Sequence, residues 1–124
     1  MLDVTVLCTE DGDACPIRQA LSRVSGKWQV LIVLTLEDGP LRFGELKRGI
    51  GDITQRVLTE NLRSLQRDGH LTRTVHEGPP LAVTYELTEM GLALSKRFVD
   101  LAMWGAEAHP KVTEARARYD AAQG

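Results

Sequence analysis

One segment of the chain, Thr54 to Asp68, carries polar side chains that can make paired hydrogen bonds with flat polar ligands. Its apolar residues recur at the spacing of a single helix face and comprise Val57, Leu58, Leu62 and Leu65. The opposite face is polar and comprises Gln55, Arg56, Thr59, Glu60, Arg63 and Gln66. In a DNA major groove, Gln pairs with adenine, Arg pairs with guanine, and the methyl group of Thr contacts thymine. We therefore predict a helix that reads bases, and its candidate residues are Thr54, Gln55, Arg56, Thr59 and Arg63.

Two residues of this segment need a separate interpretation. Thr54 suits the N-cap position, so its hydroxyl either caps the helix or contacts a phosphate or a base. Glu60 would repel phosphate, and we expect it to lie off the axis along which DNA approaches. The alternative for the whole polar face is an ordinary solvated helix surface.

Basic residues on either side of this helix could hold a phosphate backbone. Between Leu41 and His76, seven Lys and Arg residues stand against four Asp and Glu, whereas the rest of the chain has eight against thirteen. A local basic patch can bind phosphate although the net charge of the chain is −2, and the alternative is again a solvated surface. The candidates for contacts to the DNA backbone, directly or through a wing, are Arg42, Lys47, Arg48, Arg73, His76, Gly78 and Pro79.

The elements that must position these residues are delimited by Gly and Pro. A first helix is expected to begin at Cys15-Pro16, because Pro suits the first turn, and to end at Ser25-Gly26. Residues 27–37 are apolar, and their length favours a buried helix over a strand. A short helix over residues 43–50 and a glycine-rich turn then lead into the helix that begins near Thr54.

After Gly69 the spacing of apolar residues changes from helical to every second residue. Residues 71–76 and 83–87 predict a β-hairpin with a Gly-Pro-Pro tip. Thr88 caps a last long helix that runs to about Gly105, and a polar stretch that is expected to be helical begins at Pro110. Four helices, a hairpin and a final helix predict a mainly α fold with a small β-hairpin, a winged helix-turn-helix. A winged-helix module that binds another protein is the alternative.

Length and composition predict one compact domain with two extensions. We expect an acidic N-terminal arm over residues 1–14, a DNA-binding and dimerisation domain over 15–106, and a polar helical tail over 107–124. The acidic start of the chain does not fit a secretory signal. No apolar run is long enough to cross a membrane, so the expected location is the cytoplasm.

The last long helix is apolar over most of its circumference. One protomer of this size can cover only one side of such a helix, so we expect a symmetry mate to cover another. The alternative is a helix buried wholly within its own domain. The residues predicted to form the homodimer interface are Met90, Leu94, Phe98, Leu101 and Trp104.

The two cysteines, Cys15 and Cys8, are candidates for redox sensing. Cys15 directly precedes the first helix, where the positive end of the helix dipole favours a thiolate, and Arg18 follows one turn on. A thiolate is the form that oxidants attack, and Cys8 could act as its resolving partner. The alternative is that Cys15 is a small residue that packs the N-terminal region.

Other kinds of chemistry find little support in the sequence. The Cys and His residues are not paired at the spacing of metal ligands, so we expect no metal and no cofactor. The sequence shows no Ser-His-Asp order of a catalytic triad, no paired carboxylates of an active-site pocket and no phosphate-binding loop. We therefore do not expect the protein to be an enzyme.

An ordered series of motifs over residues 15–105 resembles the HxlR family of bacterial regulators, relatives of the MarR-type winged helices. The motifs are Cys15-Pro16-Ile17, Gly26-Lys27-Trp28, Gly39-Pro40-Leu41-Arg42-Phe43-Gly44-Glu45-Leu46, Ile53-Thr54-Gln55-Arg56-Val57-Leu58-Thr59, Leu62-Arg63-Ser64-Leu65, Arg67-Asp68-Gly69, Pro79-Pro80, Tyr85-Glu86-Leu87-Thr88 before Gly91, Leu101 and Trp104-Gly105. The chain departs from the family pattern in having glycine at three positions around the helix before the recognition helix, namely Gly44, Gly49 and Gly51.

The resemblance implies a function as well as a fold. A member of this family is expected to be a sequence-specific transcriptional regulator that binds double-stranded DNA, as a homodimer on a two-fold symmetric operator, and we expect it to act as a repressor. Some members sense oxidants through the Cys that precedes Pro, which here is Cys15. Regulation by a small-molecule effector in place of an oxidant is the alternative.

Overall fold

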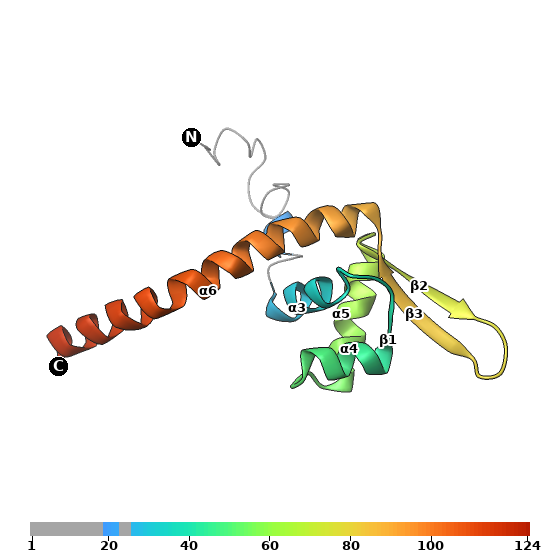
Figure 1. The fold of residues 1–124 in the computed structure, drawn as a ribbon, viewed down its shortest axis with the longest axis horizontal. Helices are drawn as coiled ribbons and strands as arrows, with labels where there is room; N and C mark the ends of the chain where they lie inside the picture. The colour runs from blue at the N-terminus through green and yellow to red at the C-terminus, as the bar shows by residue number, and fades with distance from the viewer. Residues whose placement is uncertain (1–18, 23–25) are drawn as a thin grey trace.

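The structure is a computed structural model that describes residues 19–22 and 26–124 (Figure 1). The elements in this part are α3 (Lys27–Thr35), β1 (Leu41–Arg42), α4 (Phe43–Ile50), α5 (Gln55–Arg67), β2 (Leu71–His76), β3 (Ala82–Leu87) and α6 (Glu89–Gln123). Residues 19–22 are also helical, and the rest of the helix expected after Cys15 lies outside the described residues. The predicted class, mainly α with a small β element in a winged helix-turn-helix, is confirmed.

The core forms around α3, which packs against α4, α5 and α6. This explains why residues 27–37 look apolar all round, since a helix with neighbours on several sides has no wide solvent face. The sequence alone did not exclude a strand for this segment, and the structure has a helix there. The fully or nearly buried apolar side chains are Ile32, Val33, Leu36, Leu46, Ile53, Leu58, Leu62, Leu65, Leu71, Leu87 and Phe98.

The β element is a three-stranded antiparallel sheet in the order β1-β3-β2. The hairpin pairs β2 with β3 from Leu71↔Leu87 to His76↔Ala82. The sequence predicted only this hairpin, and the third strand, β1, was missed because two residues are too short to show an alternating pattern. β1 pairs with β3 at Leu41↔Tyr85, which ties the start of α4 to the base of the wing.

The turn between α4 and α5 sets the direction of α5. Gly51 closes α4 with φ +99°, a backbone conformation that L side chains rarely adopt, and its N–H donates to the Lys47 carbonyl at 2.9 Å. Ile53 follows and is buried against the core, so the chain is anchored one residue before the N-cap of α5. The short helix and the glycine here are therefore parts of the turn that joins two packed helices.

α6 begins where the sheet ends and continues far beyond the core (Figure 1). Thr88 caps it by accepting from the Gly91 N–H at 3.1 Å, and its hydroxyl donates to the Gly69 carbonyl at 2.6 Å. Gly91 sits directly against the His70 carbonyl, where a Cβ would collide with backbone. In the described part of the chain, no helix is long and apolar enough to cross a membrane.

The expected end of this helix near Gly105 was wrong. α6 runs without a break to Gln123, through Pro110, and its 35 residues span ~52 Å at 1.5 Å per residue. Pro110 removes one helical hydrogen bond but does not end the helix. The polar tail is helical, as predicted, but it is the second half of one continuous helix.

Candidate nucleic-acid interface

The polar face of α5 lies on the surface, as its apolar spacing predicted. Leu58, Leu62 and Leu65 are buried in the core, whereas Gln55, Arg56 and Arg63 are exposed. Thr59 is half-buried beside them. α4 lies on the side of the protomer away from α6, and α5 directly follows it in the chain. The hairpin of β2 and β3, which follows α5, projects to one side of the molecule (Figure 1). This is the arrangement in which a recognition helix can enter a major groove beside a wing.

The two threonines of this face use their hydroxyls within the helix. The Val57 N–H donates to the Thr54 hydroxyl oxygen at 3.2 Å, so Thr54 is the N-cap of α5. Its own O–H remains available as a donor to a phosphate or a base. The Thr59 hydroxyl donates to the Gln55 carbonyl at 2.8 Å. Its proton is thereby committed to the backbone, which leaves the methyl group as the part of Thr59 that suits a thymine contact.

Arg56 is paired with Glu60 one turn further along α5. The Arg56 Nε donates to Glu60 Oε1 at 3.1 Å, and the two side chains are 87% and 58% exposed. The contact uses Nε and leaves the two terminal Nη groups free. Since guanine is recognised by paired donors to O6 and N7, the Nη groups can still serve that role. Glu60 is therefore an ion-pair partner of Arg56, a contact that sequence reasoning missed although the i, i+4 spacing indicates it.

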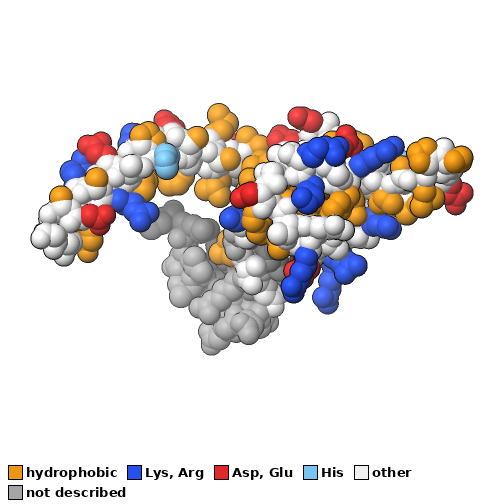
Figure 2. Space-filling view, turned by 90° about the horizontal axis from the view of Figure 1, so that it is seen from below, with side chains coloured by type: hydrophobic (Ala, Val, Ile, Leu, Met, Phe, Trp, Pro, Cys, Tyr) orange, Lys and Arg blue, Asp and Glu red, His pale blue; other side chains and the backbone are white. Residues whose placement is uncertain are grey.

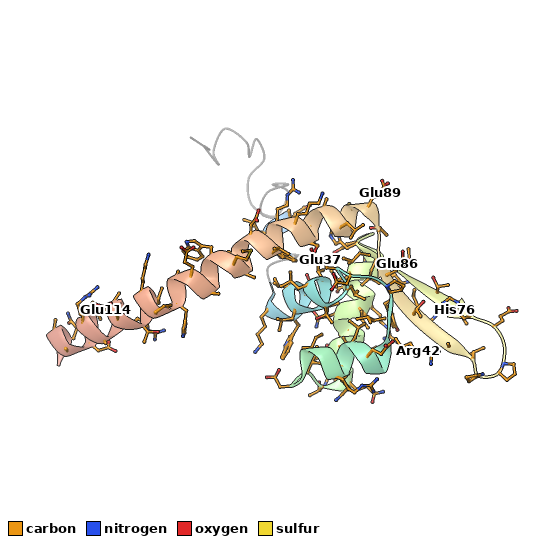
Figure 3. The ribbon with its side chains drawn as sticks, viewed as in Figure 1. Glu37, Arg42, His76, Glu86, Glu89 and Glu114 are labelled. Carbon is orange, nitrogen blue, oxygen red and sulfur yellow. The ribbon has the colours of Figure 1, made fainter. Side chains whose placement is uncertain are left out.

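The cations that precede α5 come from β1 and α4. The Arg42 N–H donates to the Glu45 carboxylate at 2.9 Å, which caps α4, while the Arg42 side chain is exposed beside the sheet (Figure 3). Lys47 is half-buried and Arg48 is exposed in the last turn of α4. The Arg48 guanidinium lies over Gly44, where even a Cβ would come within 3.2 Å of Nη1.

The wing carries its polar residues on both strands. The His76 Nε2 lies 2.9 Å from the Thr84 hydroxyl oxygen on the facing strand, which fixes the imidazole on the hairpin (Figure 3). Arg73 is exposed and is the register partner of Tyr85. Gly78 and Pro79 are exposed at the tip.

A hollow of about 400 Å³ separates the recognition helix from the wing. It is lined by Thr59, Leu62, Arg63 and Gln66 of α5, Arg73 of β2 and Tyr85 of β3. The hollow brings together Arg63, predicted to read bases, and Arg73, predicted to contact the backbone. Sequence reasoning did not assign Gln66 or Tyr85 to the site, although the hairpin register with Arg73 would have placed Tyr85 there.

Most of the cations predicted to contact DNA have no carboxylate partner among the described residues. Within residues 19–22 and 26–124 the only ion pairs are Arg56–Glu60 and Arg118–Glu114, so the other predicted DNA-contacting cations have no carboxylate partner there. Figure 2 shows Lys and Arg side chains over the part of the molecule that carries these elements, with fewer Asp and Glu. Within the same residues, no group of three His, Cys, Asp or Glu side chains is arranged to hold a metal ion.

The predicted dimer residues divide into two sets. Phe98 is only 7% exposed and belongs to the core of its own protomer, so it offers no surface to a partner, contrary to expectation. Leu94 is half-buried against the same core. Met90, Leu101 and Trp104 are 50%, 57% and 63% exposed. The redox candidates Cys15 and Cys8 lie outside the described residues.

Comparisons with known proteins agree with this geometry. The model of the HxlR-like helix-turn-helix family matches residues 23–113. An HTH-type transcriptional regulator of Escherichia coli K12, YtfH, is 37% identical over 92 residues, which cover 74% of this chain and 73% of YtfH. The solved transcriptional regulator ytfH of Salmonella typhimurium is 35% identical with a TM-score of 0.77 over 86% of this chain and 95% of that one. The redox regulator HypR in its oxidised form is 38% identical with a TM-score of 0.71 over 75% and 96% of the respective chains. The chain therefore belongs to the HxlR-like helix-turn-helix family of transcriptional regulators.

Proposed function

We propose that this regulator binds a two-fold symmetric operator as a homodimer and inserts α5 of each protomer into a major groove. The observation that carries the proposal is that α5 is amphipathic. Its leucine face is buried, and its polar face begins at the capped N-terminus. The N-terminal residues of a recognition helix meet the base edges. Repression follows if a dimer on its operator excludes other proteins from the same DNA.

The residues proposed to face the bases lie in the first two turns of α5. Arg56 reads guanine through its free Nη groups, Gln55 reads adenine through its amide, and the Thr59 methyl contacts thymine. Thr54 keeps a hydroxyl proton for a phosphate or a base edge at the helix start. Arg63 stands further along α5, where it faces the hollow beside the wing.

The backbone contacts are proposed to come from elements on both sides of α5. Arg42, Lys47 and Arg48 approach one strand from β1 and α4, while Arg73 and His76 do so from the wing. The exposed tip at Gly78 and Pro79 approaches the adjacent minor groove. Such contacts fix the register of the protein on the duplex without reading its sequence.

The homodimer is proposed to form through the exposed side of α6. All residues from His109 to the end of α6 are exposed in the protomer. A helix that projects without packing partners is marginal in water, so a second copy has a stabilising role. Leu101, Trp104 and Met90 supply exposed apolar surface for that contact. Pairing about a two-fold axis would place two recognition helices on successive major grooves, ~34–36 Å apart.

A response to oxidants is the second proposal, supported by the similarity to the redox regulator HypR. Cys15 would be the oxidised thiol, with Cys8 as resolving partner within or between protomers. A small-molecule effector would instead leave DNA binding unchanged by oxidation. Operator binding before and after diamide treatment separates the two.

Selection of duplexes from genomic fragments by the purified full chain tests the main proposal. We expect enrichment of short sites with two-fold symmetry. A family of sites without any common sequence, or no retention of DNA, would contradict it and favour a protein-binding module.

A further inference from the structure

The hollow between α5 and the wing gathers side chains from three elements. Arg63 and Gln66 are exposed residues of α5 that line the hollow, and Arg73 and Tyr85, which also line it, are register partners on β2 and β3. Two arginines from separate elements therefore line the same space of about 400 Å³. In sequence they lie ten residues apart, and only the packing of the hairpin against the end of α5 brings them together.

The lining of the hollow is suited to an anion. It contains no Asp or Glu, and neither arginine has an ion-pair partner among the described residues. Gln66 and Tyr85 add neutral hydrogen-bond donors. Guanidinium groups bind phosphate oxygens through two parallel N–H bonds, more specifically than an ammonium group does.

The position of the hollow between α5 and the wing indicates which anion would bind in it. When α5 lies in a major groove and the hairpin approaches the neighbouring minor groove, the strand that separates the two grooves must pass between them. The hollow occupies that gap. A phosphodiester of this strand would therefore enter it from the open side.

We propose that the hollow is a clamp for one DNA phosphodiester, bracketed by Arg63 from α5 and Arg73 from β2. The inference rests on the proposed binding of duplex DNA and changes the role of Arg63 from reading a base to holding the backbone. Because the two cations come from the helix and from the wing, their shared phosphate fixes the angle between both elements and the duplex. Tyr85 also lines the hollow and is partly buried against the core.

The first test is a double-variant cycle on a duplex that the wild-type chain selects from a random pool. Arg63→Gln and Arg73→Gln each remove one charge and keep a hydrogen-bonding side chain. We expect each to weaken binding by about tenfold, and the double variant to weaken it by clearly less than the product of the two. The slope of log affinity against log salt should fall by about 1.8 for the dimer in the double variant, which is one phosphate per protomer at about 0.9 each, and not by about 3.6, the value for two phosphates per protomer.

The second test locates the phosphate. Single methylphosphonate linkages, which are neutral, are placed one by one along the strand. One linkage should weaken binding of the wild-type chain and have no effect on Arg63→Gln/Arg73→Gln. The matched control is Arg97→Gln on α6, which makes the same charge change away from the hollow and should keep the sensitivity to that linkage.

The outcomes separate the clamp from the function on which it rests. If the wild-type chain selects no duplex, the proposed function fails and the clamp with it. If it binds DNA but Arg63→Gln selects a different base at one position, Arg63 reads a base and the clamp is wrong. Multiplicative losses, or no linkage whose effect depends on both arginines, also overturn it. Equal thermal unfolding of all variants shows that the losses come from the interface.

Discussion

Arg56→Ala separates the recognition chemistry of α5 from its stability. The Arg56 side chain is 87% exposed and its one recorded partner is Glu60 at 3.1 Å, so removing it costs the fold only the value of a solvated i, i+4 pair, about 0.2–0.5 kcal/mol. A bidentate contact to guanine is worth about 1–3 kcal/mol of discrimination. We therefore expect thermal unfolding to change by a few degrees at most, while affinity for the preferred duplex falls by about 5- to 150-fold for each half-site.

The assay is fluorescence anisotropy on two sets of duplexes, the selected site and its single-base variants. With Arg56→Ala, the preference for guanine at one position in each half-site should disappear. Duplexes that lack that guanine in both half-sites should bind the variant and the wild type alike. Glu60→Gln should weaken the same preference partially, since it removes the charge that holds the Arg56 Nε. Equal weakening on every duplex would make Arg56 a phosphate contact and refute the reasoning.

Further outcomes follow from the described residues and, for Cys15, from the sequence and the similarity to HypR. Lys47→Ala should weaken binding to all duplexes alike and lower the salt slope of the dimer by about 1.8, or about 0.9 for each protomer. An altered sequence preference would contradict its assignment to the backbone. Trp104→Glu should shift sedimentation from dimer to monomer, because a partner would bury its 63% exposed side chain, and a variant that stays dimeric would contradict the α6 interface. Phe98→Ala should instead lower the free energy of protomer unfolding by about 3–5 kcal/mol, because Phe98 belongs to the core. Cys15→Ser should bind the operator equally before and after diamide, while the wild type loses affinity; an unaffected wild type would argue for another effector. Gly91→Ala should lower the midpoint temperature of thermal unfolding strongly, since its Cβ would collide with the His70 carbonyl. An unchanged midpoint temperature would mean that the backbone can shift to accept the Cβ.

The sequence was sufficient for those parts of the site that depend on local periodicity. The buried face of α5 and the capping role open to Thr54 are functions of residue spacing within one helix, and both agree with the structure. The hairpin was likewise predicted from apolar residues at every second position, and the structure pairs the two strands. A helix that is polar on one side also fixes which residues can meet DNA, which is why the candidate face of α5 lies where it was expected.

The features that sequence reasoning missed depend on contacts between elements. β1 is defined by its pairing with β3, and two residues carry no pattern of their own. Phe98 and Trp104 are both large apolar residues of α6, and their spacing alone does not tell that one packs into the core while the other stays exposed. The meeting of Arg63 and Arg73 likewise depends on how the hairpin packs against α5.

The central claim is that two copies of α5 read a two-fold symmetric duplex, and the most direct measurement is the sequence selected by the full chain from a random duplex pool. The account predicts an inverted repeat whose half-site centres are ~10–10.5 base pairs, or a multiple of that distance, apart. It also predicts that Arg56→Ala relaxes one position in each half-site. A single asymmetric site, or a pool without enrichment, would contradict the account.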